Sequence, residues 1–180
     1  DGAWPAGTVA YGSAYSGIDV AAAVIHDMSD GDWSYQFASE PMPCRRRVLE
    51  SAWGDFGLAA ERIYHDARAT DARREAPVDV FVVTPVCQPF SKRNHTPDLE
   101  TQARALADAH AALDYVRLAR PRIVIVENAS APALVGHMDT IVLGIPDYTW
   151  SSAIIDPRDL GGFAARTRCY WVGVAHRRSQ

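Results

Sequence analysis

Residues 78–91 read Val-Asp-Val-Phe-Val-Val-Thr-Pro-Val-Cys-Gln-Pro-Phe-Ser, an apolar strand that runs into a proline-flanked cysteine. Thr84 and Pro85 end the strand, because proline cannot donate to a strand ladder. Cys87 is therefore expected in the loop that leaves the carboxyl end of the strand, the edge at which open α/β sheets bind ligands. There it is either a nucleophile or a small buried hydrophobe, as most free cysteines are.

Two further segments place charged side chains where predicted strands end or begin. Residues 122–128 read Arg-Ile-Val-Ile-Val-Glu-Asn, and residues 123–126 are apolar. The carboxylate of Glu127 at the end of this run either accepts hydrogen bonds from neighbouring backbone amides or binds the donors of a ligand. Residues 161–174 carry Arg166 and Arg168 in alternation before a β-branched and aromatic strand. Alternation places both guanidinium groups on one face, as a solvated strand edge or as an anion site.

Small residues and carboxylates mark the amino-terminal part of the chain. Residues 11–20, Tyr-Gly-Ser-Ala-Tyr-Ser-Gly-Ile-Asp-Val, are not a G-x-G-x-x-G fingerprint, but they predict a strand, a tight turn and a helix whose N-terminus points at a ligand. Glu40 ends the next predicted strand about twenty residues later, where an acid can accept both hydroxyls of a ribose. Asp66 by itself is an ordinary turn residue.

The order of predicted elements indicates the fold class. Strands and helices alternate, which argues for an α/β fold with a doubly wound, mostly parallel sheet, and the last two strands are expected to pair antiparallel. Length and apolar content fit one domain, residues 1–180. Strands are predicted near residues 8–13, 34–39, 61–64, 78–84, 122–127, 148–155 and 168–175, and helices near 17–28, 43–54 and 101–119.

Together and in this order, these segments resemble the C5-cytosine DNA methyltransferase family, which has a Rossmann-like fold and uses S-adenosylmethionine. The family's Pro-Cys-Gln motif, followed by Phe-Ser, is similar to residues 86–91. Its Glu-Asn-Val motif resembles residues 127–129, and its Gln-x-Arg-x-Arg motif resembles residues 164–168. Residues 11–20 look most like the less glycine-rich first motif of the de novo branch.

The resemblance implies a mechanism and a set of site residues. Cys87 would add as a thiolate to C6 of a flipped cytosine, so that C5 can take the methyl group. Glu127 would form hydrogen bonds to N3 and to the exocyclic amine of the cytosine, while Arg166 and Arg168 orient the base. By the same resemblance, the cofactor is held by Tyr11, Gly12, Ser13, Ala14, Tyr15, Ser16, Gly17, Glu40, Asp66, Ala67 and Pro85, and the substrate by Gln88, Ser91 and Asn128; no metal is expected.

The sequence also departs from the family pattern. Val86 replaces a proline, which frees the loop that aims the thiolate, and Ala164 replaces a glutamine, which removes hydrogen bonds that steady the arginines. Ala129 stands where the family has valine. The resemblance covers residues 11–173, and the family's target-recognition region and final motifs have no counterpart here. Target recognition is therefore expected from a missing segment or a partner chain.

Charge and cysteine content bear on the binding partners and the cellular location of the protein. The formal net charge of −4 is unexpected for an enzyme of nucleic acids, because affinity for phosphates comes mostly from Lys and Arg. Positive charge is nevertheless clustered locally, as at residues 45–47 and 166–168. The three cysteines show no C-x-x-C spacing, which argues against a zinc site or a disulfide framework. An intracellular, nuclear or nucleoid-associated location is expected.

Three interpretations stay open. The first is a methyltransferase core that acts on DNA, or on transfer RNA as one branch of the family does. The second is a catalytically inactive module that serves as a scaffold or regulatory subunit. The third is a cysteine hydrolase that pairs Cys87 with His95, His110 or His176, which would leave Glu127 and the arginines unexplained.

Overall fold

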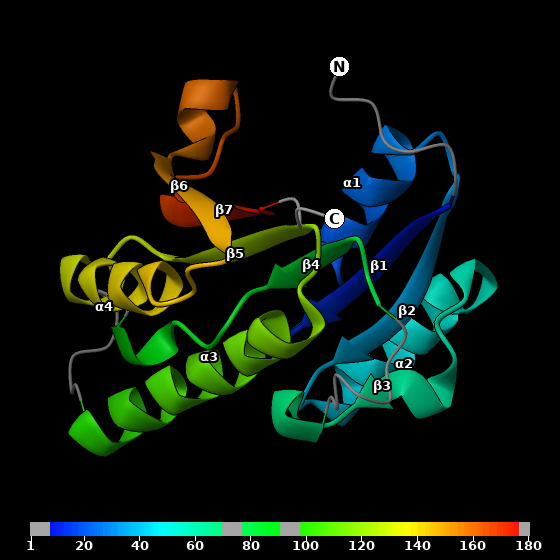
Figure 1. Ribbon diagram of the computed structural model, residues 1–180, viewed down its shortest axis with the longest axis horizontal. Helices are drawn as coiled ribbons and strands as arrows, with labels where there is room; N and C mark the ends of the chain where they lie inside the picture. The colour runs from blue at the N-terminus through cyan, green and yellow to red at the C-terminus, as the bar shows by residue number, and fades with distance from the viewer. Residues whose placement is uncertain (1–7, 70–76, 91–97, 177–180) are drawn as a thin grey trace.

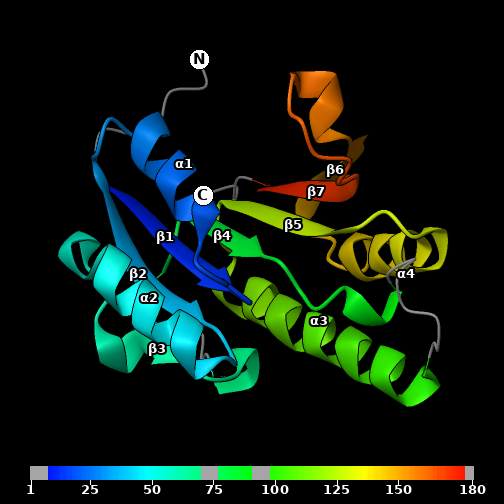
Figure 2. The ribbon, with the colours of Figure 1, turned by 180° about the vertical axis from the view of Figure 1, so that it is seen from behind.

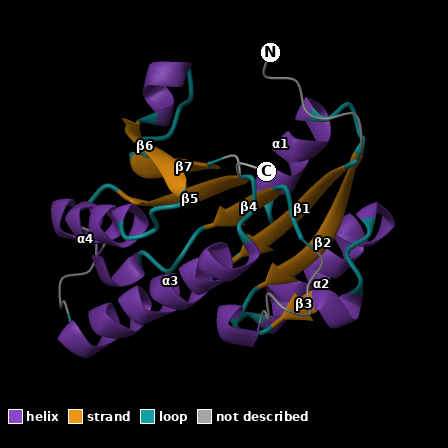
Figure 3. Ribbon diagram, in the orientation of Figure 1, coloured by secondary structure: helices purple, strands orange, loops and turns teal. Residues whose placement is uncertain are grey.

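The structure of the chain is a computed structural model that describes residues 8–69, 77–90 and 98–176. A single sheet holds seven strands in the order β3-β2-β1-β4-β5-β7-β6 (Figures 1 and 3). The strands are β1 (Val9–Ala14), β2 (Trp33–Ser39), β3 (Ile63–Tyr64), β4 (Val80–Val83), β5 (Ile123–Ala129), β6 (Tyr148–Ile155) and β7 (Arg168–Ala175). The helices are α1 (Val20–Met28), α2 (Pro43–Trp53), α3 (Leu99–Ala119) and α4 (Pro132–Leu143).

The strand order contains a topological switch point. β1 pairs in parallel with both β2 and β4, and the chain fills the β2–β3 side of the sheet before it crosses to β4 and β5. β7 runs antiparallel between β5 and β6. This confirms the predicted α/β fold with a mostly parallel sheet and a C-terminal antiparallel pair. Open sheets bind ligands at such a switch point, which here lies between β1 and β4.

Helices cover both faces of the sheet, because successive side chains of a strand point to opposite faces (Figures 1 and 2). Helices α1 and α2 pack on one face, and α3 and α4 on the other. On the first face, the core includes Ala22, Ile25, Leu49, Val80 and Val82. On the second face, it includes Leu113, Val116, Leu134, Met138, Val124, Val126 and Trp171.

A register shift between β1 and β2 determines which side chains of β2 point into each of the two cores. Tyr11 pairs with Tyr35, but the next residue, Gly12, pairs with Phe37, so β2 contains one extra residue at that point. Phe37 consequently packs in the core of the α3 face, while Tyr35 packs in the core of the α1 face. A Cβ atom on Gly12 would lie 2.9 Å from the Phe37 ring, so the close approach requires glycine.

Helix α4 was not predicted from the sequence. Its buried residues Leu134, Met138 and Ile141 follow helical spacing, and a proline lies in its first turn. Gly136 in its interior lowers the intrinsic helix propensity, as do the β-branched residues that follow. Packing against the sheet outweighs that weak local preference.

Part of the α1 face of the sheet carries exposed apolar side chains. Val172 and Val174 of β7 are exposed, and no helix within the described ranges covers them. On α1, Val20, Val24 and Met28 are also exposed, at the spacing of one helical stripe. Sheets built from parallel strands usually have both faces covered. Among the described helices, none is long and apolar enough to cross a membrane.

Candidate functional site

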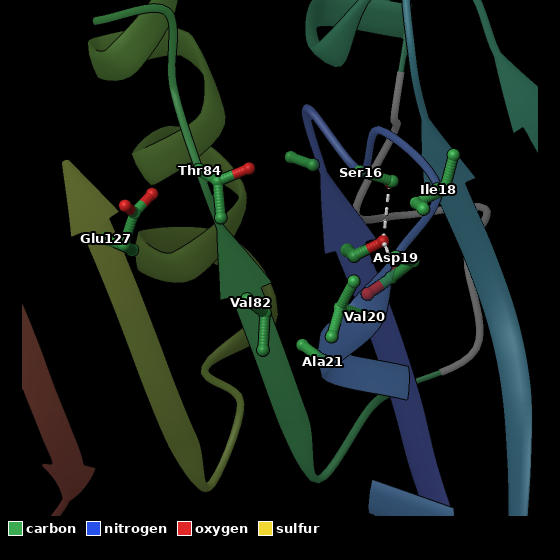
Figure 4. Close-up of a pocket in the computed structure, with 10 residues that line it drawn as sticks. Ser16, Ile18, Asp19, Val20, Ala21, Val82, Thr84 and Glu127 are labelled. Atoms are coloured by element: carbon green, nitrogen blue, oxygen red, sulfur yellow. Dashed lines mark hydrogen bonds between the residues drawn. The ribbon is translucent and has the colours of Figure 1, made fainter. Parts of the chain in front are cut away.

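A pocket of about 220 Å³ lies at the switch point between β1 and β4 (Figure 4). Glu127 and Thr84 lie on one side of it, opposite the loop that joins β1 to α1. The lining residues are Ser13, Ala14, Ser16, Ile18, Asp19, Val20, Ala21, Val82, Thr84 and Glu127. The pocket therefore joins Ser13, Ala14 and Ser16, which were predicted to bind a cofactor, with the predicted catalytic residue Glu127.

The loop from Tyr15 to Asp19 has a tightly constrained backbone. Tyr15, Gly17 and Asp19 all adopt positive φ, a conformation that is uncommon outside glycine. Hydrogen bonds from both neighbouring strands hold the loop: the Ser16 amide donates to the Ser39 carbonyl at 2.9 Å, and the Thr84 hydroxyl donates to the Tyr15 carbonyl at 2.8 Å. The loop thus presents a fixed backbone to the pocket.

Asp19 anchors this loop and was not identified from the sequence. Its buried carboxylate accepts hydrogen bonds from the Tyr11 hydroxyl at 2.9 Å, from the Ser13 hydroxyl at 2.6 Å and from the Tyr35 hydroxyl. It also caps α1 by accepting from the Ala22 amide at 3.1 Å. Burial raises the pKa of Asp19, and these hydrogen bonds oppose the rise. An aspartate just before an apolar helical run is the signal that could have identified it.

Glu127 and Arg168 form an ion pair at the pocket, with Arg168 Nε 2.8 Å from Glu127 Oε1. Burial raises the pKa of Glu127, and the positive charges of Arg168 and Arg166 oppose that rise. Strand β7 begins at Arg168, so Arg166 lies in the segment that leads into the strand. The positive charges of the two arginines act together on Glu127.

Cys87 lies in the loop after β4 and is half-buried. Its carbonyl accepts a hydrogen bond from the Phe90 amide at 3.1 Å, and Phe90 packs against the core under α3 and α4. Cys87 is not among the residues that line the pocket, although Val82 and Thr84 of the same segment are. Gln88 is exposed beside it and Pro85 is buried, while Ser91 lies outside the described residues.

Glu40 is almost fully buried, at 2% exposure, and both of its carboxylate oxygens accept hydrogen bonds from backbone amides. Oε2 accepts from the Gly17 amide at 2.9 Å, and Oε1 accepts from the Met42 amide at 2.8 Å. Glu40 therefore ties the end of β2 to the loop at the pocket. Each oxygen keeps a lone pair for a further donor.

The remaining residues of the predicted site that the structure describes do not line the pocket. Tyr11 is buried in the core against Asp19, and Gly12 faces the Phe37 ring. Asp66 forms an ion pair with Arg68 at 3.3 Å, next to the buried Ala67. Tyr15 donates from its hydroxyl to the Asp108 carbonyl at 3.1 Å. Asn128 is buried on the face opposite Glu127 and accepts from the Ala129 amide at 2.8 Å.

The histidines proposed as partners of Cys87 have other contacts. The ring of His110 packs edge-on against His137, and His176 Nε2 lies 3.1 Å from the Thr149 hydroxyl. His95 lies outside the described residues. Within the described part of the chain, no hydrogen bond joins Cys87 to a histidine. The same ranges contain no group of three or more His, Cys, Asp or Glu side chains placed to hold a metal ion.

Comparison with known proteins places the fold among methyltransferases. No family model and no curated protein sequence matches the chain, whereas solved structures do. A prophage-encoded E. coli protein, assigned as a DNA modification methyltransferase, matches with a TM-score of 0.69 at 15% identity over 93% of this chain and 47% of its own. The Dnmt2 methyltransferase of S. pombe matches with a TM-score of 0.66 at 15% identity, over 96% of this chain and 51% of its own. The Entamoeba histolytica methyltransferase EhMeth matches with a TM-score of 0.66 at 12% identity, over 96% of this chain and 55% of its own.

These likenesses show that the chain has the fold of those methyltransferases. The chain spans about half the length of the structures it matches. The matches cover 93–96% of this chain.

Proposed function

We propose that this chain is the catalytic core of a methyltransferase that transfers a methyl group from S-adenosylmethionine to C5 of cytosine in DNA. The observation that carries the proposal is the Glu127–Arg168 pair at a switch-point pocket, opposite a fixed β1–α1 loop. A carboxyl group hydrogen-bonded to a guanidinium group suits the recognition of a base edge that carries both donor and acceptor atoms. Residues 1–180 form a single domain in this proposal.

The chemistry of the pocket fits the cofactor. The carboxylate of Asp19 lines it, and S-adenosylmethionine carries a positive sulfonium and an ammonium group, which a carboxylate attracts. Its volume of about 220 Å³ is below the roughly 300 Å³ typical of sites that enclose a drug-sized ligand, so it would take one end of the cofactor. Ser13, Ser16 and Gly17 would hold that end, and Glu40, Asp66 and Ala67 the adenosine. When bound, the cofactor supplies an electrophilic methyl group.

Glu127 would activate the base. Because burial raises its pKa, the carboxyl group holds a proton more readily than an exposed glutamate does, and a protonated carboxyl can donate to N3 of cytosine. That hydrogen bond stabilises the negative charge that spreads to N3 when a nucleophile adds at C6. Arg168 would keep the carboxyl group oriented, since it is already bonded to it.

Cys87 would be the nucleophile. As a thiolate, its Sγ would form a bond to C6 while the C5–C6 π electrons move onto C5. C5 would then bond to the methyl carbon as the bond from that carbon to the sulfonium sulfur breaks, and S-adenosylhomocysteine would leave. Loss of the C5 proton to a base and cleavage of the Sγ–C6 bond restore the aromatic ring and the thiolate. Because Cys87 does not line the pocket in the structure, this step requires its loop to move toward Glu127 when nucleic acid binds.

The substrate and the partner follow from the same chemistry. A cytosine within a duplex cannot reach a pocket of this kind, so the base must be flipped out. The net charge of −4 gives the core little general attraction for DNA, so recognition of the target sequence is assigned to a further segment or a partner chain.

Methyl transfer from radiolabelled S-adenosylmethionine tests this proposal, with cytosine-containing duplex DNA and RNA as acceptors. Cofactor binding is measured separately by calorimetry. Transfer to DNA by the wild type and by Cys44→Ala, together with no transfer by Cys87→Ala, supports the proposal; Cys44 is an exposed cysteine on α2. Cofactor binding without transfer to any acceptor, even when the segment or partner chain that supplies target recognition is added, would instead identify a non-catalytic module. Transfer to RNA alone would overturn the assignment to DNA.

A further inference from the structure

The segment that joins β6 to β7, residues 156–167, forms a compact projection that we call the β6–β7 arm. It stands clear of the sheet and of both helical layers in two opposite views (Figures 1 and 2). Asp156 binds the arm together: its carboxylate accepts from the Arg158 amide at 3.0 Å, from the Arg158 side chain, and from the Thr167 hydroxyl at 2.9 Å. Since Thr167 immediately precedes β7, Asp156 links both ends of the arm.

A tight glycine turn completes the arm. Gly161 has a φ of 84°, and the Gly162 amide donates to the Pro157 carbonyl at 2.8 Å. A Cβ atom on Gly162 would lie 2.9 Å from the Pro157 oxygen, so the turn has no room for a side chain there. The arm is therefore held in shape by its own hydrogen bonds and not by packing against the sheet.

The arm directs its apolar side chains into solvent. Phe163 has a relative exposure of 105%, and Leu160 of 77%. A single exposed apolar residue is ordinary on a protein surface. Phe163 differs because it directly follows the Gly161–Gly162 turn and its ring is fully exposed. A phenylalanine side chain has only two rotatable bonds, so its ring offers a flat surface with little entropy to lose on binding.

The base of the arm lies at the same edge of the sheet as the candidate site. Ile155 at the end of β6 pairs with Arg168, and Arg168 pairs with Ala129 at the carboxyl end of β5. Arg168 is also bonded to Glu127. The ring of Phe163 thus belongs to the segment that enters the site, five residues before Arg168.

Arg166 supplies positive charge between Phe163 and the site. Its side chain is exposed, and among the described residues it forms no hydrogen bond or ion pair. Its charge nevertheless reaches Glu127, where it opposes the rise in the pKa of that carboxyl group. An exposed aromatic ring and a free guanidinium three residues away are the two elements with which proteins bind unpaired nucleotides, one for the base and one for the phosphate.

We propose that Phe163 stacks on an unpaired nucleobase next to the target cytosine and that Arg166 contacts the adjoining phosphate. This inference rests on the function proposed above. It assigns the β6–β7 arm to single-stranded or locally opened nucleic acid. Stacking is tolerant of sequence, because every base has a π-face, so the arm adds affinity without selecting a target sequence.

Binding of a fluorescent single-stranded cytosine-containing oligonucleotide, followed by anisotropy, tests the inference. Phe163→Ala and Phe163→Leu are each expected to weaken binding by about 5- to 150-fold, the range for loss of one base–aromatic stack. Phe163→Trp is expected to bind at least as tightly as the wild type. Leu160→Ala, on the same arm, is the matched control and should change binding by less than about twofold. Arg166→Ala should lower the slope of log affinity against log salt by about one.

Several outcomes would overturn the inference. Wild-type affinity in Phe163→Leu would mean that binding does not require an aromatic ring at this position and that Phe163 is not a stacking residue. Unchanged affinity in Phe163→Ala, or no binding of the oligonucleotide by the wild type, would also contradict it. Folding is checked by circular dichroism, and Phe163 lies outside both cores.

Two further measurements test the proposed function independently of oligonucleotide binding. Calorimetry with S-adenosylmethionine and the methyl-transfer assay depend on the pocket and on Cys87. Oligonucleotide binding that depends on Phe163, without cofactor binding or transfer, would contradict the proposed function alone. Methyl transfer with an unchanged KM for the oligonucleotide in Phe163→Ala would contradict this inference alone.

Discussion

Arg168 reaches across the antiparallel β5–β7 pair to Glu127, with 2.8 Å between Nε and Oε1. The two side chains retain 18% and 23% exposure, so the pair is open to a ligand but largely withdrawn from water. A charge-assisted hydrogen bond in such surroundings fixes the carboxyl group more firmly than a surface ion pair would. The ion pair therefore fixes the orientation of the Glu127 carboxyl group at one wall of the pocket.

Glu127→Gln is expected to lower single-turnover methyl transfer by about 100-fold, within the usual range for loss of general acid catalysis. An amide has nearly the same shape but cannot donate a carboxyl proton to N3. The affinity for S-adenosylmethionine should change by less than about threefold, as measured by calorimetry. Glu61→Gln, an exposed glutamate before β3, is the control. Retention of half the wild-type rate by Glu127→Gln would exclude the assigned role.

The pH dependence of stability reports the protonation of Glu127. Burial raises its pKa, so the folded chain binds this proton more tightly than the unfolded chain does. The resulting stability is fully present below the unfolded pKa, about 4.3, and is lost as the pH rises through the folded pKa. The free energy of unfolding of the wild type minus that of Glu127→Gln, from urea denaturation, should fall across this window. A difference that grows with pH would mean that attraction to Arg168 outweighs burial.

Glu40→Ala is expected to weaken cofactor binding by at least about tenfold. The change leaves the Gly17 and Met42 amides without their acceptor, so the loop at the pocket loses one of its ties to the end of β2. It should also lower the free energy of unfolding by about 1–3 kcal/mol, because two part-buried hydrogen bonds, each contributing about 0.5–1.5 kcal/mol, are lost. Calorimetry and urea denaturation measure the two effects. Glu50→Ala on the exposed face of α2 is the control, and equal cofactor affinity in both variants would refute the expectation.

Gly12→Ala and Gly136→Ala should have opposite effects on stability. A Cβ atom at Gly12 would lie 2.9 Å from the Phe37 ring, so the strand must shift, and we expect a loss of about 1–3 kcal/mol. At Gly136, inside α4, a Cβ atom meets nothing within 4 Å, and alanine should add about 0.5–1 kcal/mol through helix propensity. Urea denaturation compares the two variants. Equal effects would argue against the described register of β1 and β2.

The fold was predictable because its strands are short apolar runs that end at clear breaks. Thr84 and Pro85 follow the end of β4 at Val83, and the predicted strand over residues 168–175 coincides with β7. Helix α4 escaped prediction, because the glycine at position 136 and the β-branched residues after it weaken the local signal, and tertiary packing decides the outcome.

The site was predictable only in part, because its geometry depends on contacts between distant residues. Ser13, Ser16 and Glu127 do line one pocket, as the shared edge of the sheet implies. The network that joins Asp19 to Tyr35 links residues of two elements, and nothing local in the sequence pairs them. The sequence likewise contains no signal that the loop with Cys87 leaves that residue outside the pocket.

Covalent trapping tests the central claim most directly. The chain is incubated with S-adenosylmethionine and an oligonucleotide that contains 5-fluorocytosine, whose fluorine blocks the final loss of a proton from C5. The account predicts an adduct of increased mass that maps to Cys87, forms in Cys44→Ala and is absent in Cys87→Ala. An adduct that forms equally well in Cys87→Ala would contradict the account, as would methyl transfer to cytosine by that variant at the wild-type rate.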